Sequence, residues 1–192
     1  MRLGRDFFER DVLLCARELI GCEMVLGECR GRIVETEAYA ELGDEACHTF
    51  MRESTRQFIA NHSAGTAYVY QNYGIHWLFN VLTKGPSGNG FVLVRALAPL
   101  EGIVTMRRRR GVDGEKNLCS GPGKLTVAMG FGREFHGKDI CQPGGVELVF
   151  GKGEVETDVR IGISRAKEKP WRFLERASPW VSVKPKKTGA TS

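Results

Sequence analysis

The order of apolar and polar positions along the chain predicts a helix followed by a hairpin. Apolar residues recur at helical spacing in the segment 11–21, and Gly21 is well placed to end the helix. Residues 22–26 and 29–40 are rich in β-branched residues with a period of two on either side of Gly27, which predicts a hairpin with a long second strand. The residues that share the apolar face of the helix are Val12, Ala16, Leu19 and Ile20.

Three further strands are predicted in the middle of the chain. Aromatic and β-branched runs at 66–74 and 75–82 meet at Asn72-Tyr73-Gly74, and a third run at 91–97 follows a glycine-rich turn. Consecutive strands of this kind form an antiparallel meander. Residues 41–66 are polar and irregular, and we expect them to form an unusually long loop of the kind that tends to carry function.

The last third of the chain contains both helical spacing and strand-like alternation of apolar residues. Residues 100–111 have apolar residues at helical spacing, and Pro122 is expected to open a short helix over 124–130. Strand patterns return at 146–150 and 159–164. In the first of these helices the apolar positions are Leu100, Ile103 and Val104.

This order of elements lacks a regular strand–helix–strand alternation. It predicts the α+β class, with a curved antiparallel β-sheet and surrounding helices in a single domain over residues 1–183. Residues 170–183 are apolar enough to pack back on that domain, while residues 184–192 are expected to form a basic, flexible tail.

Composition narrows the class of protein. A chain of 192 residues with 42% hydrophobic residues fits one domain with one core. No apolar stretch approaches the length of a membrane span, and residues 1–11 lack the apolar region of a secretory signal peptide. We therefore expect no membrane association and an intracellular location, cytoplasmic in a prokaryote and nuclear in a eukaryote.

Cysteine, histidine and glycine patterns favour neither a metal nor a bound cofactor. The six cysteines form no CxxC pair and the four histidines no HxxxH pair, which favours free, mostly buried thiols in a reducing compartment. The glycine-rich segment 121–124 has Leu118 and Leu125 where a phosphate-binding loop would need glycine and a hydroxyl residue, so we expect it to cap a helix.

The charge is moderately basic and unevenly distributed. The formal net charge is +5, with one basic run at Arg107–Arg110 and another at Lys184, Lys186 and Lys187. Such runs suit an anionic partner, but they equally suit ordinary solvated surface or a helix C-terminus, which favours cations.

Candidate chemistry lies first on the predicted strand 30–39, with the sequence RGRIVETEAY. Because side chains alternate along a strand, Ile33, Glu35, Glu37 and Tyr39 are predicted to face one side. A carboxylate beside an aromatic ring suits a pocket for a nucleobase, although the same mixture is unremarkable on a solvent-exposed face.

Three tyrosines and one arginine are further candidates. Tyr68 and Tyr70 share a strand face, with core packing expected for Tyr68, whereas Tyr73 at the predicted hairpin tip could enter a base stack. Arg95 ends an otherwise apolar strand, so its guanidinium should reach a partly buried carboxylate, as a structural ion pair, or a phosphate.

Six motifs, taken together in order, resemble the alkyladenine (3-methyladenine) DNA glycosylase family. They are RGRIVETEAY, DEACH, AYVYQNYG, FVLVRALAPLEG, LCSGPGKL and RFLERASPWVSV, and they span nearly the whole chain. The resemblance implies an enzyme that flips an alkylated or deaminated purine from double-stranded DNA and hydrolyses its N-glycosidic bond. The damaged-purine class comprises 3-methyladenine, 7-methylguanine, hypoxanthine and ethenoadenine, and we expect a monomer that leaves an abasic site.

The resemblance also assigns roles to individual residues. Glu37 is implied to be the general base that activates water, with Arg95 and the backbone carbonyl of Ile161 holding that water. Tyr73 is implied to intercalate into the DNA, and Asn80 to screen the purine 2-position. Tyr39 and His48 are implied to line one side of the pocket and Tyr70 the other, with Ala46, Phe91 and Leu93 completing the wall.

This chain departs from the family pattern beside the pocket and the DNA-intercalating tyrosine. It lacks a proline after Thr55, it has Asn61-His62-Ser63 in place of an apolar turn, and Gln71-Asn72 replaces aliphatic or aromatic residues. These differences bear on substrate preference and on DNA contact, while Glu37 and Arg95 are unchanged.

Two other functions remain open at this stage. A nucleic-acid-binding module without catalysis could use the three tyrosines as a stacking platform and would not need Glu37. A glycosidase acting on free nucleosides or sugars would show turnover without duplex DNA and little dependence on salt.

Overall fold

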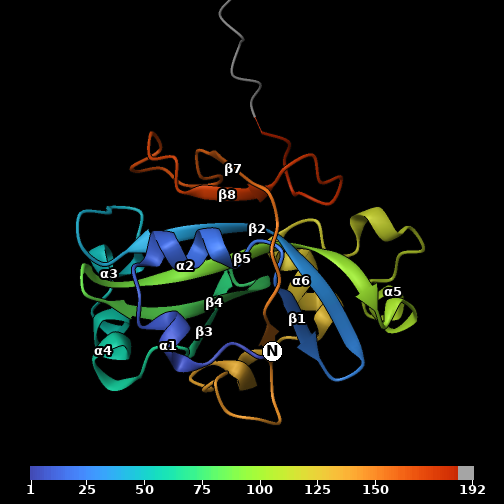
Figure 1. Ribbon diagram of the computed structural model, residues 1–192, viewed down its shortest axis with the longest axis horizontal. Helices are drawn as coiled ribbons and strands as arrows, with labels where there is room; N and C mark the ends of the chain where they lie inside the picture. Colours follow the sequence, from blue (N-terminus) through green and yellow to red (C-terminus); the bar gives the residue numbers. More distant parts are fainter. Residues whose placement is uncertain (186–192) are drawn as a thin grey trace, which may run out of the picture.

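A computed structural model describes residues 1–185, which are built around one eight-stranded antiparallel sheet (Figure 1). The strands are β1 (Glu23–Leu26), β2 (Cys29–Ala40), β3 (Ala67–Asn72), β4 (His76–Gly85), β5 (Gly88–Glu101), β6 (Glu147–Val149), β7 (Val155–Asp158) and β8 (Arg172–Glu175). The helices are α1 (Arg5–Phe8), α2 (Val12–Glu18), α3 (His48–Met51), α4 (Glu53–Asn61), α5 (Ile103–Arg110) and α6 (Pro122–Met129), with short 3₁₀ turns η1 (Glu115–Asn117) and η2 (Arg133–Phe135). The predicted α+β class is confirmed. Most of the predicted basic tail, residues 186–192, lies outside the described residues.

The long strand β2 organises the sheet. The strand order is β3-β4-β5-β2-β1-β6, so β5 pairs along one edge of β2 and β1 along the start of the other. Further along that second edge, β8 pairs with Glu35–Glu37, and β7 pairs with β8. The C-terminal segment therefore packs back on the domain, as predicted, and Figure 1 shows β7 and β8 lying over β2.

A β-bulge in β2 makes the observed strand face differ from the predicted one. The register between β2 and β5 shifts on both sides of Glu35, so side chains before and after this point exchange faces. Ile33 lies in the main core, on the same side as Ala38, and Thr36 donates a hydrogen bond to the Ala16 carbonyl. The expectation that Ile33 shares a face with Glu37 is therefore wrong.

Two apolar clusters occupy the two faces of the sheet. Helices α2 and α6 cover one face and bury residues such as Val81, Val92 and Val94 in the main core. The other face carries a smaller cluster in which α4 contributes Phe58 and Ile59. That second face is the one that holds the site described below.

The segment 41–66 is not the long loop that its polarity predicts. It contains α3 and α4, and α4 buries Thr55, Phe58 and Ile59 on one side while its remaining residues are exposed. Three buried positions among nine helical residues give too weak an apolar signal to be recognised among the surrounding polar residues.

Two other predictions need correction. Residues 159–164 form no strand, although their apolar residues alternate, and the strand of this region, β7, ends at Asp158. Helix α5 begins only at Ile103, Leu100 belongs to β5, and Val104 is 77% exposed. The helix instead buries Thr105 and Met106, and Ile103 packs against the main core as predicted.

The remaining expectations concern thiols and membranes. All six cysteines are free and all except Cys141 are buried, as the spacing predicted. Within residues 1–185, no helix has both the length and the apolar character that crossing a bilayer requires.

Candidate active site

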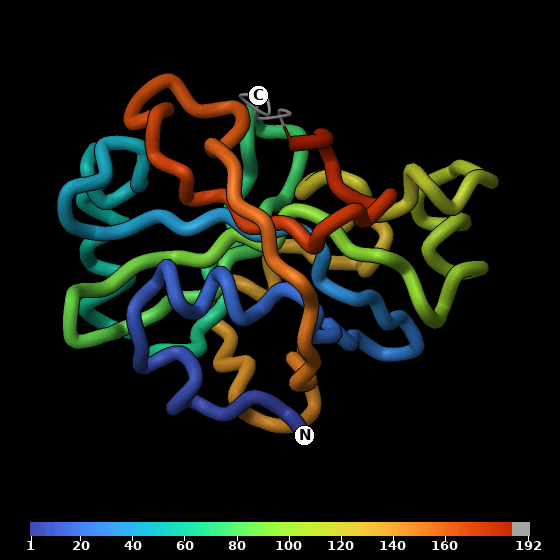
Figure 2. Tube along the Cα trace, turned by 45° about the horizontal axis from the view of Figure 1, so that its top comes forward, coloured from blue at the N-terminus to red at the C-terminus, as the bar shows by residue number. Residues whose placement is uncertain are grey.

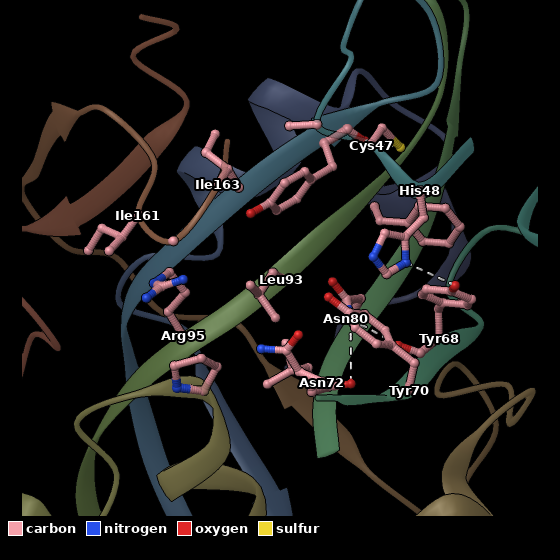
Figure 3. Close-up of a pocket in the computed structure, with 16 residues that line it drawn as sticks. Cys47, His48, Tyr68, Tyr70, Asn72, Asn80, Leu93, Arg95, Ile161 and Ile163 are labelled. Carbon is pink, nitrogen blue, oxygen red and sulfur yellow. Dashed lines mark hydrogen bonds between the residues drawn. The ribbon is translucent and has the colours of Figure 1, made fainter. Parts of the chain in front are cut away.

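A cavity of about 260 Å³ opens on the second face of the sheet. Figure 3 shows Arg95, Ile161 and Ile163 on one side of it and His48, Tyr68 and Tyr70 on the other. The residues that the family resemblance implies for the pocket wall all line this cavity, and so does Arg95: Tyr39, Ala46, His48, Tyr70, Asn80, Phe91, Leu93, Arg95 and Ile161. The β-sheet supplies most of these side chains because, after the bulge, alternate residues of β2, β3, β4 and β5 point to this face.

Glu37 lies directly behind the cavity wall rather than on its surface. Its side chain is fully buried, and its three hydrogen-bond donors all line the cavity. Oε2 accepts from the Tyr39 hydroxyl at 2.7 Å and from Arg95 Nη1 at 3.1 Å, and Oε1 accepts from the Ile161 backbone N–H at 2.8 Å. The structure thus brings Glu37, Arg95, Tyr39 and Ile161 together, although Ile161 contacts Glu37 through its N–H.

Arg95 bridges two buried carboxylates. Nε donates to Glu35 Oε1 at 3.1 Å while Nη1 donates to Glu37. Burial acts to lower the pKa of Arg95, but the charges of Glu37 and Glu35 outweigh it and raise that pKa above its usual value. The guanidinium is therefore a permanent cation in the cavity wall, and the structural ion pair weighed from the sequence is present.

Tyr39 is fixed by a second buried arginine. Arg160 lies over the Tyr39 ring at 4.7 Å and forms a two-pronged ion pair with Asp44, at 2.6 and 2.7 Å. Burial and the neighbouring charge of Glu37 raise the pKa of Tyr39 well above its ordinary value. Tyr39 therefore stays protonated and donates a hydrogen bond to Glu37.

His48 and Tyr70 form the opposite wall. Their ring centroids are 4.4 Å apart and tilted by 60°, so His48 lies beside Tyr70 rather than across the cavity from it. A base stacked between the two rings would need roughly 3.5 Å on each of its faces. The implied sandwich with His48 and Tyr70 on opposite sides is thus wrong for this arrangement of the rings.

The protonation state of this wall follows from burial. Burial lowers the pKa of His48 to about 4, and Nδ1 contacts the Tyr68 hydroxyl at 3.2 Å, which in turn contacts Thr55 Oγ1 at 3.1 Å. Burial also raises the pKa of Tyr70. At neutral pH the wall is an uncharged aromatic surface. Tyr68 packs in the second apolar cluster, as expected.

Asn80 is held rigidly in the cavity floor. Its Nδ2 donates to the Tyr68 carbonyl at 3.1 Å and to the Leu78 carbonyl at 3.5 Å, and its side chain is buried. Phe91 and Leu93 lie beside it on β5, with Leu93 directly opposite Asn80 in the register between β4 and β5.

Tyr73 stands apart from the cavity at the tip of the β3–β4 hairpin. It is 89% exposed and has φ of 51°, and the neighbouring Ile75 is 71% exposed. The backbone therefore holds a large aromatic ring in solvent, as the turn predicted.

Sequence reasoning missed the residues that organise the site. Asp44 accepts hydrogen bonds from the N–H groups of Ala40 and Ala46 as well as from Arg160, and so fixes the segment that carries the Ala46 wall. The signal that singled out Arg95, an arginine within an apolar run, is also present at Arg160 in the segment 159–164. The cavity-lining residues that were not predicted are Cys47, Tyr68, Asn72, Leu78, Pro122, Gly162 and Ile163.

Residues 1–185 contain no group of three or more histidine, cysteine, aspartate or glutamate side chains placed to hold a metal ion. The segment 121–124 begins α6, with Pro122 in its first turn, as expected for a helix cap. The site itself combines a buried carboxylate, Glu37, with an arginine in the wall of an aromatic cavity.

Comparison with known proteins shows the family of the chain. The family model described as Methylpurine-DNA glycosylase (MPG) matches residues 6–179. A protein of Agrobacterium fabrum named "Putative 3-methyladenine DNA glycosylase" is 45% identical over 181 residues, covering 94% of this chain and 92% of its own length. Proteins of the same name from Rhodopseudomonas palustris strain BisB18 and Chlorobaculum tepidum are 42% and 40% identical, and each comparison covers 94% of this chain and 90% of the relative. The chain belongs to the methylpurine-DNA glycosylase family.

Proposed function

We propose that this chain flips a damaged purine nucleotide out of duplex DNA into the aromatic cavity and hydrolyses its N-glycosidic bond. Membership of the family supports the general activity, which is the removal of alkylated purines by a 3-methyladenine DNA glycosylase in base excision repair. One observation supports the mechanism most directly: the Glu37 carboxylate is held between Arg95 and the Ile161 N–H at the wall of an aromatic cavity.

Glu37 acts as the general base. An ionised carboxylate offers about four acceptor positions, and its three donors leave one for a water molecule. Two of those donors fix Oε2, so the remaining position belongs to Oε1, beside Ile161. The Ile161 carbonyl and Arg95 hold that water against the sugar C1′, and the carboxylate takes its proton as the bond to the base breaks.

The Glu37 carboxylate also stabilises the reacting sugar. Cleavage of a glycosidic bond develops positive charge on the sugar ring, and a nearby carboxylate stabilises that charge. Within residues 1–185 no lysine lines the cavity, which supports water rather than an amine as the nucleophile. The expected product is an abasic site with an intact phosphodiester backbone.

The cavity favours damaged bases before any hydrogen bond is formed. Extruding a nucleotide costs a few kcal/mol, and less when the base already pairs poorly. Each stacking contact, here with Tyr39 and Tyr70, returns roughly 1–3 kcal/mol. A neutral His48 adds no charge that would repel a cationic base such as 3-methyladenine or 7-methylguanine.

Two further residues set specificity and extrusion. Asn80, whose amide orientation is fixed, screens the purine 2-position and so disfavours normal guanine. Tyr73 fills the space left in the duplex, since an exposed ring at a hairpin tip can insert between bases. We extend the substrates to hypoxanthine and ethenoadenine and expect a monomeric, intracellular enzyme that acts on double-stranded DNA.

The substitution Glu37→Gln tests this mechanism. It keeps the shape of the side chain and removes the base, so release of 7-methylguanine, hypoxanthine and ethenoadenine from single-lesion duplexes should fall at least about 10²-fold. Binding to the same duplexes should survive. Base release is measured by alkaline cleavage of abasic sites under single-turnover conditions, and binding by fluorescence anisotropy.

Glu45→Gln provides the matched control, because Glu45 is exposed and its carboxylate pairs with Arg165 on the surface. This variant should release bases at the rate of the unmodified protein. Full activity of Glu37→Gln would contradict the proposed mechanism. Absence of strand breaks with all three lesions in the unmodified protein would favour a binding module, and turnover of free nucleosides would favour a nucleoside hydrolase.

A further inference from the structure

The second carboxylate of β2, Glu35, is buried and has no part in the mechanism above. Its side chain is fully buried and receives four donors. Arg95 Nε, Arg172 Nη1 and Ser182 Oγ lie 3.1, 3.2 and 2.8 Å from Oε1, and the Ser182 N–H lies 2.5 Å from Oε2. Three of these donors lie on Oε1 and one on Oε2, all four belong to the protein, and Glu35 is not among the residues that line the cavity within residues 1–185.

Glu35 determines which part of Arg95 reaches Glu37. It takes Nε, so the guanidinium plane is fixed with Nη1 against Glu37 Oε2. A guanidinium is planar and rigid, and anchoring one edge sets the direction of the other N–H groups. Without the Glu35 contact, Arg95 could rotate to pair with Glu37 through both of its terminal nitrogens.

Two donors to Glu35 come from one end of the chain. Residues 176–185, which we call the C-terminal strap, follow β8 and pass over the middle of the sheet (Figure 2). Ser182 binds Glu35 through both its N–H and its hydroxyl, and the next residue, Val183, accepts at 3.2 Å from Arg172 Nη2. Arg172 is itself paired with Glu35 and with Asp158. The strap therefore contacts both a carboxylate and a guanidinium of the ion-pair network: Ser182 donates to Glu35, and Val183 accepts from Arg172.

Stability alone is a poor reason for such a network. A buried ion pair loses so much hydration that apolar residues of similar size often give equal or greater stability. Here three carboxylates and two guanidinium groups lie together, all but Arg95 and Asp158 with side chains no more than 1% exposed. The ion pairs fix the direction of the Arg95 N–H groups, which apolar packing could not do.

We propose that Glu35 and Ser182 are positioning residues, through which the C-terminal strap fixes Arg95 against the Glu37 carboxylate. This inference rests on the proposed function of Glu37. It makes the strap part of the catalytic apparatus, although the strap itself contributes no residue to the cavity wall within residues 1–185.

The substitution Ser182→Ala tests the proposal with both carboxylates in place. It removes one of the four donors to Glu35, and we expect the single-turnover rate of base release to fall roughly tenfold, since small displacements of a catalytic group have large effects on rate. The dissociation constant for a duplex carrying a tetrahydrofuran abasic analogue should change by less than about twofold, because Ser182 is not among the residues that line the cavity. Ser182→Thr, which restores a hydroxyl, should recover most of the rate.

Ser178→Ala is the matched control. Ser178 lies on the same strap, and within residues 1–185 its hydroxyl has only a local hydrogen bond, which it accepts from the Trp180 N–H. This variant should keep the rate of the unmodified protein. Glu35→Gln should slow base release roughly 10²-fold, and adding Ser182→Ala to it should cause little further loss, because the two act through one contact.

The outcomes are distinguishable. If Ser182→Ala lowers the melting temperature but leaves the saturated rate unchanged, the contact is only structural and the proposal fails, whether or not Glu35→Gln folds. If Glu37→Gln is inactive while Ser182→Ala and Glu35→Gln both release bases at the unmodified rate, the positioning role fails and the proposed function stands. If Glu37→Gln is fully active, the proposed function itself fails.

Discussion

At the scale of single residues, the site depends on which groups keep or lose a proton on burial. Tyr39 keeps its proton and donates a hydrogen bond to Glu37, while His48 is held neutral beside Tyr70. Arg95 remains charged because two carboxylates oppose the effect of burial. The cavity thus combines an uncharged aromatic wall with one permanent cation.

The neutral state of His48 makes stability depend on pH. Burial lowers its folded-state pKa to about 4, whereas an unfolded histidine titrates near 6.5. The stability that this difference provides is fully present above pH 6.5 and is lost as the pH falls through 4. Relative to His48→Phe, which keeps an aromatic ring there, the unmodified protein should lose at most about 3 kcal/mol of unfolding free energy over that range.

Urea denaturation of both proteins at several pH values measures this difference. The comparison with His48→Phe removes the effect of other titrating groups, which both proteins share. Parallel pH profiles for the two proteins would contradict a neutral, buried His48.

At the scale of elements, one arginine of the basic run in α5 binds the C-terminal end of a neighbouring helix. Arg109 Nη1 donates to the carbonyls of Ala128 and Met129 at 3.0 and 2.7 Å, at the C-terminal end of α6. For this arginine, the helix-terminus interpretation of the basic run is confirmed. Arg107 instead pairs with Glu115 at 2.9 Å, near the surface.

Arg109→Ala should therefore destabilise the fold. Removing a charged donor from two helix-terminal carbonyls should lower the unfolding free energy by roughly 1–3 kcal/mol. Arg108→Ala is the control: both arginines are exposed on the same helix, but within residues 1–185 the Arg108 side chain has no hydrogen bond or ion pair, so its loss should change stability by less than about 0.5 kcal/mol. Equal effects of the two substitutions in urea denaturation would refute the capping role.

Much of the sheet and part of the site could be predicted because they depend on local patterns. Alternation placed Glu37 and Tyr39 on one face, and an arginine in an apolar run identified Arg95. The bulge at Glu35 could not be predicted, because it depends on the register between two strands, and Ile33 was misplaced as a result.

Other features escaped prediction because their partners are distant in sequence. Asp44 and Arg160 are 116 residues apart, and Glu35 and Ser182 are 147 apart. The segment 159–164 was mistaken for a strand because its apolar residues alternate, yet Ile161 and Ile163 are apolar because they wall a cavity.

At the scale of the whole molecule, the net charge of +5 suits binding to a polyanion. Each phosphate contact releases counterions, so affinity falls as salt rises. We expect the affinity of Glu37→Gln for a lesion-containing duplex to fall at least about tenfold between roughly 50 and 200 mM KCl. Anisotropy titrations measure this slope, and an affinity independent of salt would instead favour action on free nucleosides.

The long-range contacts of β2 also determine when, during synthesis of the chain, the active site can be completed. Synthesis delivers Glu35 and Glu37 to the ribosome exit early, but Ile161 follows Glu37 by 124 residues and Ser182 follows Glu35 by 147. Until those later residues emerge, both acidic groups lack several of their partners. A nascent chain can therefore form its central hairpins and still be unable to cut a glycosidic bond, so the reaction becomes possible only after Ile161 and Ser182 have emerged.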